Sequence, residues 1–378
     1  MKVRLGDYIQ EYSVRNRAEE EIPVYSVTNT EGFCTGYFDK DVASNDRSTY
    51  KIVPRGCFAY NPSRINVGSV DWQRHEDRVI VSPLYVVFSV SNGLLPQYLY
   101  YFLKSNVALT FIRATATGSV RDNLRFSMLQ EFSIEMRSIE GQTKVIQTLD
   151  CIQKLIKLYK LQLRALDTLI KARFVELFGG INEKVSIGSF CNVFGGYSFK
   201  SEDISSKGAI KILQIGNVYL DGVNWETTNY LPEEFGNSYS KFLLNEGDIV
   251  IALTRPIIQS LGNVKACIVK ESDLPCLLNQ RVGRIVPKKN IDVSIKFIYG
   301  SLMTDDFTRY VESCCIGCSQ PNISTKDIES YMIPKAGYEE QIKFVKFKEQ
   351  IDKSKVAVQA ALEKAQMLFD SLMQQYFG

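Results

Sequence analysis

The side chains best suited to chemistry in this chain are arginines, amides and hydroxyls gathered in loop-like segments. In the major groove of DNA, arginine donates two hydrogen bonds to guanine, and asparagine or glutamine pairs with adenine. Arginine and lysine also hold phosphates. The candidates for such contacts are Ser63, Arg64, Asn66, Arg121, Arg125, Tyr197, Lys200, Arg255, Gln259, Gln280, Arg281 and Gln320. Each alone would suit a solvated loop equally well, so the prediction depends on the elements that position them.

No catalytic motif accompanies these residues. The sequence has neither the G-x-x-x-x-G-K-[ST] loop of nucleotide-binding proteins nor the H-E-x-x-H of zinc proteases. Its single histidine, His75, argues against a catalytic triad. The segment NPSR (61–64) shares two residues with the N-P-P-Y motif of adenine methyltransferases, but the aromatic residue and a glycine-rich cofactor loop are missing. We expect no catalytic residue and no cofactor bound by this chain.

The cysteines do not predict a metal site. Nine cysteines suit a reducing compartment, where they remain thiols. Cys314, Cys315 and Cys318 form a C-C-x-x-C cluster, but zinc would need further ligands nearby and the first half of the chain has no matching cysteines. We interpret the cluster as small residues in a loop.

The chain contains an internal repeat. Seven residue pairs lie at a constant separation of 199 positions: Gly118 and Gly317, Asn123 and Asn322, Leu129 and Ile328, Gln142 and Gln341, Ile152 and Ile351, Leu163 and Leu362, Gly179 and Gly378. A constant offset indicates two copies of one structural unit, which predicts a pseudo-twofold arrangement. Such an arrangement suits a ligand that is itself roughly twofold, such as duplex DNA.

Each copy ends in a long amphipathic segment. Residues 142–178 contain neither proline nor glycine, carry apolar residues in alternating steps of three and four, and are followed by Gly179 and Gly180. As a helix this segment would be roughly 54 Å long. The second copy, 341–377, has Lys348 and Lys355 in its apolar seam. Because residues 181–340 would form a domain inserted between the two helices, and domain termini usually lie close together, we expect an antiparallel coiled coil.

The remaining segments predict an α+β fold. Runs of β-branched and aromatic residues occur at 22–28, 51–60, 65–72 and 79–90, and again at 210–219, 242–253, 263–270 and 281–287. A helical segment follows each set, beginning at Pro96 and near residue 293. We therefore predict two mixed, strand-rich domains, 1–141 and 181–340, separated by spacer helices at 142–180 and 341–378.

The charge and hydropathy of the chain limit the kinds of partner that it can bind. The net charge is only +3, and the single basic excess lies in 141–180, with 7 basic and 3 acidic residues. If DNA is the ligand, local clusters rather than total charge must attract it. No run of eighteen apolar residues and no signal peptide is present. We expect a cytoplasmic protein without a membrane partner.

These segments together resemble the specificity subunit of type I restriction–modification systems, over essentially the whole chain. In the first domain the resemblance is carried by PVYSVT (23–28), PRG (54–56), YNPSRINVGS (60–69), VSPLYVVF (81–88), GSVR (118–121) and LRF (124–126). In the second it is carried by GGY (195–197), KS (200–201), GNV (216–218), GDIV (247–250), LNQRVGRI (278–285), IP (333–334) and EQI (340–342). The entry to the first long helix departs from the pattern, because it reads EGQ (140–142) and lacks the preceding proline.

The resemblance implies a non-catalytic DNA-binding subunit with two target-recognition domains held apart by antiparallel coiled-coil spacers. Such a subunit recruits two modification subunits, which bind S-adenosylmethionine and methylate adenine. Restriction subunits add ATP- and Mg²⁺-dependent translocation and cleavage. Each domain would read one half of a bipartite target, and the helices would set the spacer and dock the partners.

Three other interpretations remain open from the sequence. The same module could serve a type II-like restriction system with a fused modification–cleavage partner, which gene neighbours would reveal. A coiled-coil scaffold that never contacts DNA would show no sequence preference and no steep salt dependence of binding. An enzyme acting alone would show methyl transfer by the purified chain.

Overall fold

The computed structural model describes residues 1–35, 47–115, 123–220, 222–258, 262–315 and 321–378. The chain divides into two compact units. Unit 1 comprises Met1–Leu161 together with Gln359–Gly378, and unit 2 comprises Gln162–Val358. Each unit therefore contains one strand-rich domain and parts of both long helices, and the two are described separately below.

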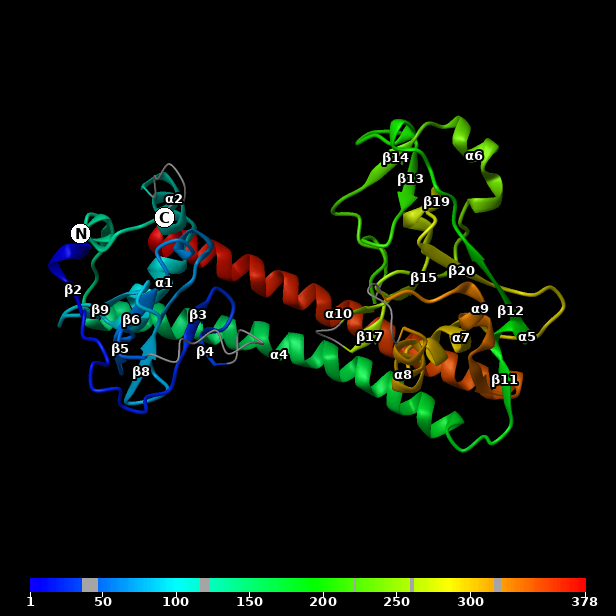
Figure 1. Ribbon diagram of the computed structural model, residues 1–378, viewed down its shortest axis with the longest axis horizontal. Helices are drawn as coiled ribbons and strands as arrows, with labels where there is room; N and C mark the ends of the chain where they lie inside the picture. Colours follow the sequence, from blue (N-terminus) through cyan, green and yellow to red (C-terminus); the bar gives the residue numbers. More distant parts are fainter. Residues whose placement is uncertain (36–46, 116–122, 221, 259–261, 316–320) are drawn as a thin grey trace. The chain divides into compact units, whose positions relative to one another are not determined.

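Unit 1 combines short strands with a helical layer (Figure 1). Its strands are β1 (Lys2–Arg4), β2 (Ile9–Glu11), β3 (Ser26–Thr28), β4 (Gly32–Cys34), β5 (Lys51–Pro54), β6 (Phe58–Tyr60), β7 (Val70–Trp72), β8 (Arg78–Val81), β9 (Val86–Val90) and β10 (Ser133–Glu135). Its helices are α1 (Pro96–Lys104), α2 (Asn106–Thr115), α3 (Phe126–Gln130) and the first part of α4 (Ile139–Phe178).

The main sheet of unit 1 has the order β2-β9-β6-β7, and all its neighbours are antiparallel. One of its faces joins α1 and α2 in a core that includes Phe58, Phe88 and Tyr98, all fully buried. Two separate pairs, β5-β8 and β3-β4, carry a second core around Val53, and β1 pairs with β10.

Unit 2 contains the corresponding elements and several additional ones. Its strands are β11 (Lys184–Ser186), β12 (Cys191–Gly195), β13 (Ile210–Leu213), β14 (Asn229–Leu231), β15 (Ile249–Ala252), β16 (Ile257–Ile258), β17 (Asn263–Val264), β18 (Ala266–Ile268), β19 (Cys276–Leu278), β20 (Val282–Pro287) and β21 (Met332–Pro334). Its helices are α5 (Ile187–Phe190), α6 (Glu234–Ser238), α7 (Ile295–Leu302), α8 (Asp305–Cys314), α9 (Thr325–Ser330) and α10 (Tyr338–Phe377), which finishes in unit 1.

The main sheet of unit 2 has the order β12-β20-β15-β18 and is again entirely antiparallel, so it repeats the sheet of unit 1 strand for strand. Equivalent turns precede the inner strands β6 and β15: Gly56 and Gly247 have φ values of 87° and 85°. Glycine adopts this left-handed conformation without the steric cost that a Cβ atom adds.

The long helices α4 and α10 each contain 40 residues and begin three residues before the predicted starts. Within unit 1, Val145 and Leu149 near the start of α4 share a core with Met373 and Phe377 near the end of α10. Within unit 2, the end of α4 shares a core with Phe344 near the start of α10. In unit 2, Phe344 packs against Phe174 and Phe178, and Lys355 further along α10 pairs with Asp167 (2.5 Å), so residue numbers rise along one helix as they fall along the other and the helices are antiparallel there.

A buried glutamine fixes the start of each long helix to its own domain. The amide of Leu95 donates to Gln142 Oε1 (2.8 Å), and the Gln142 side chain donates to the carbonyl of Arg137 (3.0 Å). The amide of Ser294 donates to Gln341 Oε1 (2.9 Å), and Gln341 donates to the carbonyl of Ala336 (3.0 Å). Leu95 and Ser294, Gln142 and Gln341, and Arg137 and Ala336 are each 199 residues apart, so the two sets of bonds correspond in the repeat.

The helices before the long ones differ from the sequence prediction, since each predicted helix is two helices. Ser105 interrupts the first with φ −71° and ψ 153°, and its hydroxyl accepts from the amide of Ala108 (3.2 Å). Thr304 begins α8 as an N-cap, with its hydroxyl accepting from the amide of Phe307. A capping hydroxyl satisfies a helix-end amide, which favours a break at these positions.

Candidate nucleic-acid interface

The loop that follows β6 forms the candidate site of unit 1. Its first residue, Asn61, accepts hydrogen bonds through Oδ1 from the amide (3.1 Å) and the hydroxyl (2.9 Å) of Ser63. The carbonyl of Pro62 accepts from the amide of Leu124 (3.1 Å), and the buried hydroxyl of Tyr60 donates to the carbonyl of Leu124 (3.2 Å). These bonds join the loop to the segment before α3.

A hollow of about 620 Å³ opens where these two segments meet. Its lining mixes apolar residues with polar side chains, which are Glu11, Asn61, Ser63, Asn123, Arg125, Ser127 and Gln130, and Arg125 is exposed. Amide, hydroxyl and guanidinium groups together provide both donors and acceptors for base edges or phosphates. The predicted residues Ser63 and Arg125 are therefore brought together.

The other predicted residues of unit 1 have different positions. Arg64 is exposed next to Ser63 on the same loop, whereas Asn66 lies in the short 3-10 helix Ile65–Val67 and its carbonyl accepts from Arg113 Nε (3.3 Å). Arg121 lies outside the described residues.

In unit 2, backbone hydrogen bonds bring three loops together. The amide of Leu253 donates to the carbonyl of Arg281 (2.9 Å), and the carbonyl of Leu253 accepts from the amide of Ile323 (2.9 Å). The amide of Arg255 donates to the carbonyl of Pro321 (2.8 Å). Both arginines are exposed, and the network holds them on neighbouring loops.

The strand β12 leads into the same network through Tyr197. The amide of Tyr197 donates to the carbonyl of Leu278 (3.0 Å), and the carbonyl of Tyr197 accepts from the amide of Gln280 (2.9 Å). Gly196 must be glycine here, because a Cβ atom would lie 2.2 Å from the carbonyl oxygen of Asn279. Tyr197, Gln280, Arg281 and Arg255 are thus linked through consecutive loops.

An aromatic cluster that the sequence analysis missed supports Tyr197. The Tyr197 ring centroid lies 4.6 Å from that of Tyr239 and 5.4 Å from that of Phe242, yet 39% of Tyr197 remains exposed. The hydrogen bond with Tyr197 is the main cause that raises the pKa of Tyr239. These partners are about 40 residues away in sequence, and no spacing rule could have identified them.

The remaining predicted residues of unit 2 are less informative. Lys200 is exposed, and its Nζ lies 3.3 Å from a carboxylate oxygen of Glu202, so its charge is partly compensated. Gln259 and Gln320 lie outside the described residues.

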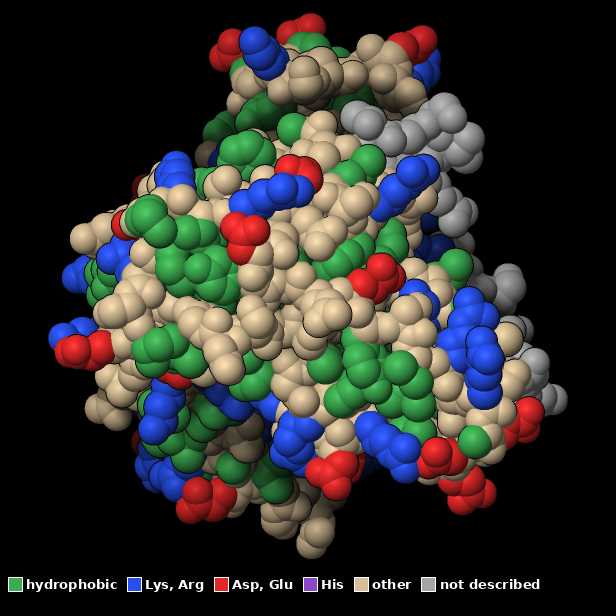
Figure 2. Space-filling view, turned by 90° about the vertical axis from the view of Figure 1, so that its left-hand side faces the viewer, with side chains coloured by type: hydrophobic (Ala, Val, Ile, Leu, Met, Phe, Trp, Pro, Cys, Tyr) green, Lys and Arg blue, Asp and Glu red, His purple; other side chains and the backbone are tan. Residues whose placement is uncertain are grey.

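The exposed arginines at the site have no acidic partner among the described residues, a property that Arg15, Arg17, Arg47, Arg113 and Arg164 share. Among the described residues, Arg64, Arg125, Arg255 and Arg281 form no salt bridge, whereas Arg55, Arg74, Arg78 and Arg309 each have a carboxylate partner. On the face of the molecule that Figure 2 shows, basic side chains form small groups among acidic ones. A guanidinium without a carboxylate partner is available to an anionic ligand.

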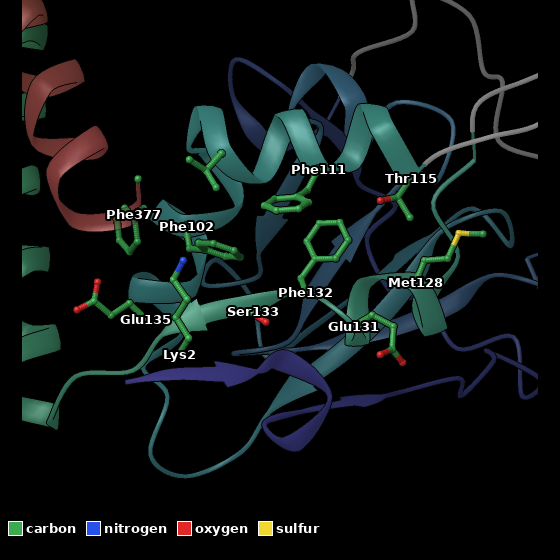
Figure 3. A pocket seen from close by; sticks show the side chains of 12 residues that line it. Lys2, Phe102, Phe111, Thr115, Met128, Glu131, Phe132, Ser133, Glu135 and Phe377 are labelled. Atoms are coloured by element: carbon green, nitrogen blue, oxygen red, sulfur yellow. The ribbon is translucent and has the colours of Figure 1, made fainter.

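A second hollow in unit 1, of about 350 Å³, has a different character (Figure 3). Phe102, Phe111, Phe132 and Phe377 give it an apolar lining, with Glu131 at its edge. Glu131 forms an ion pair with Arg4. Because this lining offers few free donors for an anion, we do not assign it to nucleic-acid binding.

The part of the chain that the structure describes contains no group of three metal-ligating side chains. Cys314 and Cys315 are half-buried, and Cys318 lies outside the described residues. Among the described helices, none combines the length and the apolar character that a membrane span requires.

Comparison with known proteins relates the chain to restriction systems. Residues 182–365 match the family model of the type I restriction modification DNA specificity domain. The chain is 28% identical over 362 residues to the type I restriction enzyme MjaVIII specificity subunit of Methanocaldococcus jannaschii, covering 90% of this chain and 83% of that protein. It is 32% identical over 192 residues to the EcoAI specificity subunit of Escherichia coli, covering 49% of this chain and 31% of that protein.

Solved structures show the same fold. A chain from a study of complex assembly and conformational transition of the type I R-M system matches with a TM-score of 0.59 at 15% identity, covering 100% of this chain and 97% of that one. The type I restriction–modification S subunit from M. genitalium matches with a TM-score of 0.53 at 16% identity, covering 100% and 96%.

Fold and sequence together relate the chain to the DNA-specificity class of restriction–modification proteins. More particularly, the chain is similar to type I restriction enzyme specificity subunits, over 90% of its length for the MjaVIII subunit and over residues 182–365 for the family model.

Proposed function

We propose that this chain is the non-catalytic, sequence-specific DNA-binding subunit of a type I restriction–modification complex. Unit 1 reads one half of a bipartite target through the loop after β6 and the segment before α3. Unit 2 binds the other half through the neighbouring loops that carry Tyr197, Gln280, Arg281 and Arg255. The observation that carries the proposal is that backbone hydrogen bonds bring exposed arginines together on neighbouring segments of each unit, Arg64 with Arg125 and Arg255 with Arg281.

The long helices supply the second part of the proposed function. Antiparallel helices pair only in discrete registers, because each seam residue inserts between residues of the facing helix. We infer that α4 and α10 set the length of the non-specific spacer and offer docking surfaces to two modification subunits. In this proposal the modification subunits bind S-adenosylmethionine and the restriction subunits use ATP and Mg²⁺, whereas this chain binds none of them.

Methylome sequencing of the host with and without this gene tests the proposal. The expected result is a bipartite motif, methylated on adenine in both halves, that disappears when the gene is deleted. An unchanged methylome in a host whose modification subunit is expressed would overturn the proposal. Inserting one heptad into both long helices at matched positions should lengthen the motif's spacer without changing either half.

A further inference from the structure

Arg64 and Arg255 occupy the same position in the two units. The turns at Gly56 and Gly247, with φ values of 87° and 85°, lie 191 residues apart, as do the starts of the equivalent strands β6 and β15. Counting on by the same offset aligns Arg64 with Arg255.

A tertiary hydrogen bond establishes the same alignment independently. The carbonyl of Pro62 accepts from the amide of Leu124, and the carbonyl of Leu253 accepts from the amide of Ile323. Pro62 and Leu253 are 191 residues apart, whereas Leu124 and Ile323 are 199 apart, as in the long helices. The two loops therefore contact the same element of each unit at the same point.

The residues around the two arginines differ. Aligned at this offset, FAYNPSRINVG (58–68) and IVIALTRPIIQ (249–259) share only the arginine, preceded by a hydroxyl residue in each case. Both arginines are exposed, and neither forms a salt bridge with any other described residue. An arginine is therefore present at the same aligned position in both units, although the flanking residues differ.

The backbone of unit 2 holds this arginine in an unfavourable conformation. Arg255 has φ 47°, which costs a residue with a Cβ atom of the order of 1 kcal/mol or more. The hydrogen bond from its amide to Pro321 and the bridge between Thr254 and Asn322 maintain this geometry. The loop therefore maintains the Arg255 backbone at an energetic cost, whereas Arg64 has φ −128°, so the two positions correspond in alignment and tertiary contact but not in backbone conformation.

We propose that Arg64 and Arg255 are a matched pair of phosphate contacts that set the register of each unit on its half-site, and that neither reads a base. This inference rests on the proposed function. An arginine that read guanine in both units would require the same base at the same place in two otherwise unlike half-sites. The phosphate backbone is the feature that every half-site shares, whatever its sequence. Base reading then belongs to the residues that differ, such as Arg125 in unit 1 and Gln280 in unit 2.

The test measures binding by the full chain assembled with its modification subunits. The probes are fluorescent duplexes that carry the methylated motif found in the host, the same motif with each base pair replaced in turn, and a scrambled duplex. For Arg64→Ala and for Arg255→Ala, we expect affinity to fall by the same factor across the panel. The slope of log K against log salt should become shallower by about 0.9 in each variant, as for the loss of one phosphate contact. Arg64→Lys and Arg255→Lys should retain most of the affinity, because a phosphate can be bound by the point charge of lysine. A base contact that depends on the two-pronged guanidinium of arginine would be weakened by the same substitution.

Arg78→Ala and Arg309→Ala are matched controls, since each removes an exposed arginine whose charge a carboxylate already compensates. An equal change of slope in these controls would show a general charge effect and overturn the inference. A changed base preference in Arg64→Ala or Arg255→Ala would also overturn it. If the unaltered complex bound the motif no better than the scrambled duplex, the proposed function itself would fail. Thermal unfolding of each variant identifies any loss of folding, and ethylation interference then locates the phosphates on the unaltered protein.

Discussion

Units 1 and 2 share a scaffold but differ in how the same positions are stabilised. In unit 1, Cys57 and Val87 lie in an apolar core. The aligned positions of unit 2 are Asp248 and Arg284, whose Oδ2 and Nε atoms are 2.7 Å apart, with side-chain exposures of 8% and 14%. Arg284 Nη1 also donates to the carbonyl of Leu243 (2.9 Å). The comparison shows that the same sheet order accommodates an ion pair or an apolar contact at one site.

The candidate interfaces differ more than the scaffolds do. Unit 1 presents a hollow of mixed character to which amides and Arg125 contribute, whereas unit 2 presents Tyr197 supported by an aromatic cluster. The variation is concentrated in loops after the strands, where changes do not disturb the sheet. Different side chains on one scaffold would give each unit its own half-site.

The largest expected effect concerns the ends of the long helices. Phe178 lies against Phe297 (5.0 Å between ring centroids) in unit 2, and Phe377 lies against Tyr98 (5.0 Å) in unit 1. Truncating either to alanine should lower the free energy of unfolding by about 3–5 kcal/mol, through lost burial and a cavity. Hydrogen exchange should show lost protection in unit 2 for Phe178→Ala and in unit 1 for Phe377→Ala. Leu368→Ala, at a side chain that is 52% exposed, is the control. The opposite pattern would contradict the assignment of helix ends to units.

The next effect tests the ion pair of unit 2. Asp248→Ala should destabilise unit 2 by about 3 kcal/mol, because it leaves Arg284 partly buried without its carboxylate. The double variant Asp248→Cys, Arg284→Val, which copies unit 1, should lose less than the single variant. Denaturant unfolding measures both. A double variant less stable than Asp248→Ala would mean that the positions are not interchangeable.

A smaller effect separates the two interfaces. Gln280→Ala should relax the preference at one base pair of the half-site read by unit 2, and Arg125→Ala should do so in the other half, each by about 1–3 kcal/mol of discrimination. Binding to duplexes with single base-pair replacements gives the measurement. Equal changes in both halves for either variant would show that the residue reads neither.

The smallest effect is a pH dependence confined to unit 2. Burial raises the pKa of Asp248 above its ordinary value of 3.8, although Arg284 opposes the shift. The folded state then binds the Asp248 proton more tightly than the unfolded state. The resulting contribution to the free energy of unfolding is fully present below pH 3.8 and is lost as the pH rises through the raised pKa. Asp248→Asn should remove that decline from the unfolding free energy of unit 2. An unchanged pH profile would indicate that another group is responsible.

Periodic features could be predicted from the sequence, and single-residue features could not. The proline- and glycine-free segments predicted both long helices to within three residues at their starts, because a heptad pattern extends over many turns. The breaks at Ser105 and Thr304 depend on local capping that the apolar periodicity conceals. The predicted strand 51–60 is two strands in different sheets, since the turn at Gly56 redirects the chain.

The candidate sites could be predicted only by residue type. Ser63 and Arg125 meet because Pro62 and Leu124 share a hydrogen bond across about 60 residues of chain, and no local pattern encodes that contact. Tyr239 and Phe242 were missed for the same reason. The repeat itself did contain usable information, because the 191-residue offset already aligned Arg64 with Arg255.

The route of the chain through the two units constrains the order in which they can form during synthesis. Unit 2 is one continuous stretch, Gln162–Val358, whereas unit 1 requires Met1–Leu161 together with Gln359–Gly378. The N-terminal domain therefore emerges from the ribosome first but waits for the end of α10, which covers Tyr98 and Phe102. Until α10 is complete, Tyr98 and Phe102 cannot pack against Phe377. The N-terminal domain is therefore synthesised first but completes its core last.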